Sequence, residues 1–372
     1  MRSFKYGDEK ISGRELMIAL PSIVISVDIL SLPKEISNDM NGSDGWIVLL
    51  VAGGFSLLII WMMARLAASF PGQSFLSYAS TILSKPVAIV LTLIFGVLFI
   101  GVAAYYIRVL GQTSQQYLFE QTPVEVVSLS FLLVIVYAVC GSRAALFRLN
   151  MLFFPIINIV LLFVLVINIK WVDVTNLLPV FQTDLKSYVK GLQTSVMAYM
   201  GFSIVLFYIA FVDKPKKAPK LAMLGMLIPI VLFILVYLFC LMIFGHAATS
   251  NLLFPTIDLA KRIEVPGGIL ERVEAFFFIV WTMGVFNGTT LAFDAAILAL
   301  NSVLKRMKKV KLVIILSPII YYIALLPRNI SQINMFQDFI HMFLVSFAFS
   351  ITIILVFAAK IRGVGRNDKA NK

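Results

Sequence analysis

The chain has 372 residues, of which 60% are hydrophobic and 13% are charged, with a mean hydropathy of +0.96 and a net charge of +12. Soluble domains carry about 25% charged and about 45–50% apolar residues. A disordered chain and an ordinary soluble enzyme are therefore excluded, because a water-soluble fold of this size could not bury so much apolar surface. The composition indicates an all-α polytopic membrane protein.

Apolar runs recur along the whole chain and predict ten transmembrane helices. Each run is long enough to cross about 30 Å of hydrocarbon at about 1.5 Å per residue. The runs are continuous and not alternating, which favours helices over barrel strands. Ser12 and Glu15 predict a capping box at the first helix. The predicted spans are 14–33, 46–69, 87–107, 123–141, 149–169, 191–212, 219–245, 271–303, 311–327 and 333–359.

The basic residues predict the orientation of the chain. If the N-terminus lies in the cytoplasm, Lys and Arg concentrate on the cytoplasmic connections and on the basic cytoplasmic tail 360–372. This follows the positive-inside rule and places both termini in the cytoplasm. Because the charges lie on alternate connections and not in one patch, we expect membrane lipid and no nucleic acid as their partner. The longer outer connections, 170–190 and 246–270, contain apolar residues and predict short helices lying on the membrane.

Motifs of soluble enzymes are absent from the sequence. There is no P-loop, no dinucleotide fingerprint, no Cys/His metal spacing and no G-x-S-x-G, and the two histidines, His246 and His341, are isolated. We therefore expect no enzyme activity, no metal site and no cofactor.

Interruptions inside two spans are the most informative features. The first span holds two prolines, three serines and Asp28, and the sixth holds Gly201 near its middle. A break in a helix is tolerated in lipid only where it faces protein or a water-filled cavity. A proline-kinked helix and simple glycine packing are the alternatives. The two spans hold corresponding places in the halves 14–169 and 191–359, which predicts two inverted five-helix repeats within a single transmembrane domain, with a ligand site at the midplane.

Two carboxylates fall inside apolar spans. Asp28 and Asp294 each lie where a charge costs about 2.5–3.5 kcal/mol, so a function or a partner is the default interpretation. We expect no Lys or Arg at their depth, because Arg65 and Arg108 lie nearer a membrane face and can extend toward it. Asp28 and Asp294 are therefore candidate ion or proton sites, with a neutral acid bonded to a backbone carbonyl as the alternative.

The eighth and third spans add further candidates. Asn287 and Thr290 share a helix face and can hydrogen-bond a ligand, while Gly284 and Gly288 form a small-xxx-small face that packing explains equally well. In the third span, Ile100 and Ala104 are candidates for a pocket wall, with core packing as the alternative.

Five stretches, taken together, resemble the B subunit of the spore germinant receptors of endospore-forming bacteria. Their order and spacing match that family along nearly the whole chain. The stretches are Ile29-Leu30-Ser31-Leu32-Pro33; Phe70-Pro71-Gly72-Gln73-Ser74-Phe75; Leu177-Leu178-Pro179-Val180; Phe254-Pro255-Thr256 with Glu264-Val265-Pro266-Gly267; and Leu270-Glu271-Arg272-Val273-Glu274, followed by Trp281 and Val285-Phe286.

The resemblance implies the fold of the amino acid/polyamine/organocation transporter superfamily, with two inverted repeats and broken first and sixth helices. It also implies the sensing of a germinant (an amino acid, sugar or nucleoside) in the spore inner membrane, with receptor A and C subunits as partners. By position, the ligand-binding breaks fall on Ser26, Val27 and Asp28 and on Tyr199, Met200, Gly201, Phe202 and Ser203.

This sequence departs from the family at both breaks. The family usually has Gly-x-Gly at the first break, where this chain has Ser26-x-Asp28, and Gly-Phe-Glu is common at the second, where this chain has Gly201-Phe202-Ser203. An uncharged or amine-bearing ligand is therefore as plausible as a simple α-amino acid. A proton- or sodium-coupled secondary transporter of the same fold is the second hypothesis, and a scaffold without a ligand is the third.

Overall fold

The computed structural model describes residues 9–199, 201–263 and 273–364, and this part of the chain is helical. Residues 1–8, Met200, residues 264–272 (with the stretches Glu264 to Gly267 and Leu270 to Arg272) and the tail beyond 364 lie outside the described residues. The helices are α1 Gly13–Ile25, α2 Asp28–Asp39, α3 Gly45–Ala68, α4 Phe75–Ile82, α5 Lys85–Tyr117, α6 Val124–Cys140, α7 Arg143–Ile167, α8 Leu185–Ala198, α9 Val205–Tyr208, α10 Ala218–Phe244, α11 His246–Asn251, α12 Pro255–Lys261, α13 Val273–Val303, α14 Lys309–Leu325 and α15 Ile330–Ile361. Short 3₁₀ turns lie between them: η1 Asn168–Trp171, η2 Val174–Leu177, η3 Phe202–Ile204, η4 Ile209–Phe211 and η5 Pro215–Lys217.

The length of the apolar helices makes this an integral membrane protein. In the described residues, 6 helices are long and apolar enough to cross a membrane, and up to 8 spans result if each of two bent pairs is one span. The bent pairs are α1 with α2, at 52°, and α8 with the segment Phe202–Phe211, at 46°. α6 and α14 are shorter, with 17 residues each. The predicted spans 46–69 and 219–245 correspond closely to α3 and α10.

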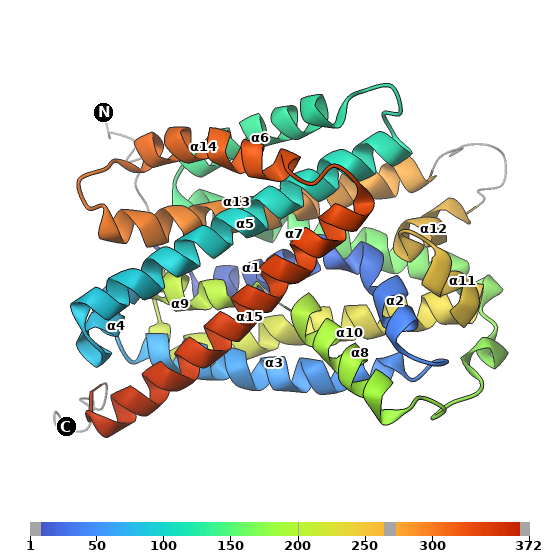
Figure 1. Ribbon diagram of the computed structural model, residues 1–372, viewed down its shortest axis with the longest axis horizontal. Helices are drawn as coiled ribbons and strands as arrows, with labels where there is room; N and C mark the ends of the chain where they lie inside the picture. Colours follow the sequence, from blue (N-terminus) through green and yellow to red (C-terminus); the bar gives the residue numbers. More distant parts are fainter. Residues whose placement is uncertain (1–8, 200, 264–272, 365–372) are drawn as a thin grey trace.

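α5 and α13 pack against each other along the middle of the bundle (Figure 1). α13 also packs on α1 and α7, so three helices surround the first bend. α4 and the C-terminal end of α15 lie at the left end of the molecule in Figure 1, and α11 and α12 lie at the right end. Apolar side chains fill the interior between these helices.

The end of α5 differs from the predicted span. The sequence placed the end at 107, but α5 continues to Tyr117. Arg108 does not extend toward a membrane face as expected: it is 5% exposed, and its Nη2 donates to Gln112 Oε1 at 3.4 Å. The helix continues because its polar residues face other helices and not lipid.

The predicted short helices are present in both long connections, as η1 and η2 in the first and as α11 and α12 in the second. The first connection is fastened to the start of α3 by Asp44, which accepts hydrogen bonds from Phe181 N at 2.6 Å and Thr183 N at 3.2 Å. Burial alone would raise the pKa of Asp44, but these hydrogen bonds outweigh it and lower the pKa below its ordinary value.

The N-terminal segment is hydrogen-bonded to the end of η4 and to the residues directly after it. Ile11 N donates to Phe211 O at 2.9 Å, and Asp213 N donates to Ile11 O at 3.0 Å. These bonds form a parallel bridge between Ile11 and Val212. α1 starts directly beyond it, with the predicted capping box of Ser12 and Glu15 in place.

Candidate functional site

The first helix bends at Ser26 and Val27, between α1 and α2. Ser26 Oγ lies 2.5 Å from the carbonyl oxygen of Ser22 and 3.0 Å from that of Gly284 in α13. Its one hydrogen serves either acceptor. A serine that bonds the carbonyl four residues back competes with the helical ladder and bends helices. The break therefore has a local cause, at the residues where it was predicted.

The second break lies between Ala198 and Phe202, and Gly201 is its central residue. The φ of Gly201 is +107°, a conformation that residues with side chains rarely adopt. A methyl group on Gly201 would lie 3.2 Å from Ile23 Cγ2 in α1. The second break thus contacts the last turn before the first break, and glycine is needed both for its backbone angle and for this close approach.

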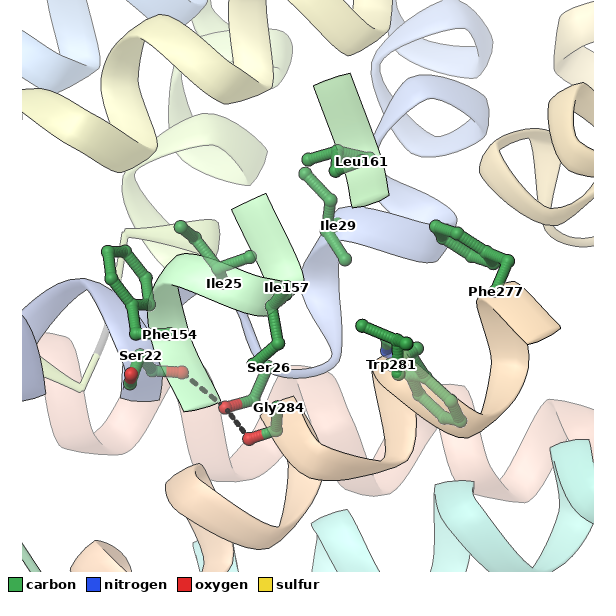
Figure 2. Close-up of a pocket in the computed structure, with 11 residues that line it drawn as sticks. Ser22, Ile25, Ser26, Ile29, Phe154, Ile157, Leu161, Phe277, Trp281 and Gly284 are labelled. Atoms are coloured by element: carbon green, nitrogen blue, oxygen red, sulfur yellow. Dashed lines mark hydrogen bonds between the residues drawn. The ribbon is translucent and has the colours of Figure 1, made fainter. Parts of the chain in front are cut away.

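A small cavity lies directly beside the first break, between α1, α7 and α13 (Figure 2). Its volume is about 20 Å³, which is room for about one water molecule. A nutrient can therefore enter only if the three helices move apart. The lining residues are Ser22, Ile25, Ser26, Ile29, Phe154, Ile157, Leu161, Phe277, Val280, Trp281 and Gly284.

Several buried polar atoms near the breaks find no hydrogen-bond partner among the described residues. Two belong to residues that line the cavity, Trp281 Nε1 and Ser22 Oγ. Asn287, one turn beyond Gly284 on α13, is fully buried and leaves both amide atoms without a partner in the same part of the chain. Such groups cost about 1–3 kcal/mol each, so they are donors and acceptors available to a ligand or to water. Asp28 Oδ1 and Ser203 Oγ are of the same kind.

Two contacts between α7 and α13 bracket Asn287. On one side of Asn287 along α13, Asp294 pairs with Arg143 of α7. On the other side, a methyl group added to Gly284 would lie 3.6 Å from Ile157 Cδ1 of α7. Asn150 of α7 lies between these contacts and is also fully buried, with an Oδ1 that finds no partner in the described structure. The sequence interpretation missed Asn150, Ser22 and Trp281 as site residues, although an amide in an apolar run and serines four residues apart were visible signals.

Other predicted site residues are hydrogen-bonded or packed within the described structure. Tyr199 is fully buried, and its hydroxyl donates to Leu49 O at 3.1 Å. Thr290 Oγ1 lies 2.9 Å from Phe286 O and 3.0 Å from Asn287 O, within its own helix. Ile100 and Ala104 are buried in α5 and do not line the cavity of Figure 2.

Phe202 and Ser203, together with Gly201, line a second hollow of about 10 Å³ against α3 and α15. Val27 lines a third cavity on the other side of the first break. The predicted residues therefore surround the breaks, but they do not converge on one open pocket.

The two glycines of the small-xxx-small face are not equivalent. A methyl on Gly284 would make ordinary contact, 3.6 Å from Ile157 Cδ1, whereas a methyl on Gly288 would overlap Ser26 Oγ and lie 2.8 Å from Tyr106 Cε2. Gly288 is therefore the residue that lets α13 approach the first break.

The expectation that no cation lies at the depth of Asp294 is wrong. Arg143 Nε lies 3.0 Å from Asp294 Oδ2, Lys309 Nζ lies 3.0 Å from Oδ1, and the Tyr208 hydroxyl donates to Oδ2 at 2.9 Å. Arg143 also pairs with Glu9. The sequence could not show this, because the cations sit at the first turns of α7 and α14, which meet α13 only in the folded chain. For Asp28, by contrast, no salt bridge is present in the described residues.

Two solved structures share the fold. MhsT in complex with L-phenylalanine aligns with a TM-score of 0.72 at 12% identity, covering 98% of this chain and 94% of that chain. MHP1, a nucleobase-cation-symport-1 family transporter in a closed conformation with bromovinylhydantoin bound, aligns with a TM-score of 0.68 at 12% identity, covering 95% and 79%.

Sequence comparisons are more specific. The spore germination protein GerLB of Bacillus cereus is 36% identical over 342 residues, which is 91% of this chain and 91% of that protein. Spore germination protein A2 of Bacillus subtilis (strain 168) is 27% identical over 91% of this chain and 92% of its own length. The family model described as spore germination protein matches residues 10–333. The chain belongs to this family of spore germination proteins.

Proposed function

We propose that the protein is the germinant-sensing membrane subunit of a spore germination receptor, which binds a small nutrient (an amino acid, sugar or nucleoside) at the two helix breaks and triggers germination. The names of its relatives support a role in spore germination, and the designations GerLB and A2 support a multi-subunit receptor with A and C partners. The proposed location is the spore inner membrane, with ten crossings, two inverted repeats (14–169 and 191–359) and both termini in the cytoplasm.

The contact between the two breaks is the observation that carries this proposal. Gly201, in a backbone conformation suited to glycine, touches Ile23 beside the Ser26 bend. Broken helices tolerated at membrane depth are typical of substrate sites, because their freed backbone groups face a ligand. Packing alone requires neither the left-handed backbone of Gly201 nor the buried polar atoms around it that lack a partner in the described residues.

The mechanism that fits this geometry is a shift between two conformations. With about 20 Å³ beside the break, the described conformation has little room for a nutrient. A ligand that bonds Trp281 Nε1 and Ser22 Oγ would bind only when α1, α7 and α13 separate, so it favours the separated state by its difference in affinity. Partner subunits would detect that separation.

Gly201→Leu tests the site. A side chain at this position meets Ile23 and an unfavourable φ, which we expect to abolish the response of spores to their nutrient while the protein stays in the membrane. The matched control is Gly54→Leu, because Gly54 is an exposed helical glycine with nothing within 4 Å of an added methyl. A normal nutrient response from spores that carry Gly201→Leu would refute this site.

The alternative is a proton- or sodium-coupled transporter of small solutes. One observation favours it: Asp28 is buried at the first turn of α2, and its Oδ1 finds no partner among the described residues. Asp294 is occupied by Arg143 and Lys309, so Asp28 is the candidate coupling group. Gradient-driven uptake of labelled solute into vesicles that hold the purified chain, lost in Asp28→Asn, would favour transport over sensing.

A further inference from the structure

A separate cavity of about 130 Å³ lies on the other side of the first break, among α2, α5, the segment before α12 and the start of α15. Leu253 and Phe254, which join α11 to α12, line it, and these two helices lie at the right end of the molecule in Figure 1. Ligand sites for drug-sized molecules measure about 300–1,000 Å³, so this cavity suits a smaller solute. Its polar lining residues are Ser31, Lys34, Glu35, Asn38, Gln112, Thr113, Gln116, Asn334 and Gln337.

The cavity holds two opposite charges that are not paired with each other. Lys34 and Glu35 are both half-buried, and no salt bridge joins them within the described structure. The neighbouring acid Asp39 is occupied by Lys190 at 2.8 Å and by the Thr194 hydroxyl at 2.5 Å. Lys34 and Glu35 are therefore a positive and a negative group that share one cavity without a salt bridge between them in the described residues. Glu35 is also hydrogen-bonded to the side chains of Ser31 and Gln337.

A second observation indicates a ligand in this cavity. Thr113, which lines it from α5, is fully buried, and its hydroxyl finds no partner in the described part of the chain. Buried hydroxyls are normally hydrogen-bonded. The group that satisfies Thr113 is thus either water or a polar solute in the cavity.

The cavity also leads to the first break. Val27 lines it, and Ser31 and Glu35 follow Asp28 by three and seven residues, which places all three on one face of α2. A solute held between Lys34 and Glu35 would lie on the approach to Asp28.

We propose that this cavity binds a small zwitterion, with the Lys34 ammonium bonding its carboxylate and the Glu35 carboxylate bonding its ammonium. We call it the outer cavity, because the proposed topology places α11 and α12 outside the membrane. A solute that carries both groups gives each half-buried charge a charge-assisted hydrogen bond, in addition to the bonds of Glu35 with Ser31 and Gln337. A solute with one charge leaves the other side chain without its counter-charge. The site rests on residues of its own and stands whether the chain senses or transports.

The test uses the purified full-length chain in lipid nanodiscs and three matched probe series. These are neutral L-amino acids from glycine to phenylalanine, their carboxamides, which lack the carboxylate, and the corresponding 2-hydroxy acids, which lack the ammonium. We expect an amino acid to bind at least about tenfold more tightly than its two analogues, as one lost charged hydrogen bond implies. If no amino acid binds, the proposal is overturned.

Two variants assign each charge to its residue. In Lys34→Gln, the amino acid should lose about tenfold in affinity while its carboxamide does not, and in Glu35→Gln the amino acid should weaken while the 2-hydroxy acid does not. General misfolding would weaken every probe alike. The matched controls are Lys186→Gln and Glu120→Gln, two exposed charges outside the cavity.

If both charge variants still prefer the amino acid over its carboxamide and its 2-hydroxy acid by the wild-type affinity ratio, the proposed zwitterion site is overturned. Gly201→Leu separates this result from the proposed function. This variant should keep the wild-type preference of the purified chain for the amino acid over its analogues, because Gly201 does not line the outer cavity. Loss of the spore response in the same variant would concern the helix breaks alone.

Discussion

Arg143 and Asp294 lie 151 positions apart in the chain and form a buried ion pair, with 3.0 Å between Nε and Oδ2. The side chain of Asp294 is 0% exposed and that of Arg143 is 8% exposed. With Lys309, Tyr208 and Glu9, the pair joins α7, α13, α14 and the N-terminal segment at one end of the bundle. The carboxylate that looked like a candidate ion site therefore holds helices together.

Asp294→Asn should destabilise the protein strongly. It leaves two cations beside a neutral amide, and breaking a buried pair from one side costs about 3–5 kcal/mol. Thermal unfolding in detergent would show this as a large fall in Tm. Lys261→Gln is the control, because its pair with Asp258, at 3.9 Å, joins side chains that are 45% and 20% exposed, and exposed pairs contribute about 0–1 kcal/mol. Equal losses in the two variants would contradict the role assigned to Asp294.

Gly288→Ala should be far more damaging than Gly284→Ala. The added methyl overlaps Ser26 Oγ at position 288 but makes only ordinary contact at position 284, and overpacking costs about 1–3 kcal/mol. Thermal unfolding of both variants measures the difference. Ser26→Gly combined with Gly288→Ala should recover part of the loss, since it removes the atom that the methyl meets. A double variant no better than Gly288→Ala would show that Ser26 is not the obstacle.

Ser26→Ala and Ser22→Ala should separate stability from response. Ser26 loses a hydrogen bond to Ser22 O or Gly284 O, at a cost of about 1 kcal/mol. Ser22→Ala removes a buried hydroxyl that has no partner among the described residues, so the unfolding free energy should be unchanged or higher. If the nutrient uses that hydroxyl, the concentration for half-maximal spore response should still rise. A lower Tm for Ser22→Ala with an unchanged response would contradict both statements.

Asp44 should make the connection between η2 and α8 sensitive to acid. Its pKa is lowered in the folded protein, because the hydrogen bonds from Phe181 and Thr183 outweigh burial. The stability it contributes is therefore fully present above the unfolded pKa, about 3.9, and is lost as pH falls through the lower folded value.

Thermal unfolding between neutral pH and pH 3 measures this loss. Asp44→Asn should be less stable than the wild type at neutral pH and should show a shallower decline in acid. Asp213→Asn serves as the control, because Asp213 is an exposed carboxylate. A decline as steep as that of the wild type in Asp44→Asn would remove Asp44 as its cause.

Much of the fold could be predicted because lipid imposes it locally. A helix that crosses a membrane must be a long apolar run, so α3 and α10 were predicted nearly to the residue. The end of α5 was missed because its polar residues, including Arg108, face protein, and hydropathy cannot separate a buried polar residue from a connection.

The candidate site was predictable only in part. Asn287 was identified because it shares a helix face with Thr290, and both side chains can hydrogen-bond a ligand. Trp281 was not, because an indole fits lipid, an interface or a core equally well. The partners of Asp294 were missed because helix ends that lie far apart in sequence converge only through the packing of α7, α13 and α14.

The bridge at Ile11 constrains how α1 can move. Two backbone hydrogen bonds fasten the segment just before α1 to Phe211, the last residue of η4, and to Asp213 beyond it. At the other end of α1, Ser26 Oγ lies 3.0 Å from Gly284 O. A helix that is held at both ends cannot rotate as a rigid body about either end, but it can bend or rotate about its own axis. The motion that widens the space beside Trp281 is therefore a bending of α1 between its two fixed ends. Loss of the backbone hydrogen bonds of Ile11 would instead allow α1 to rotate as a rigid body.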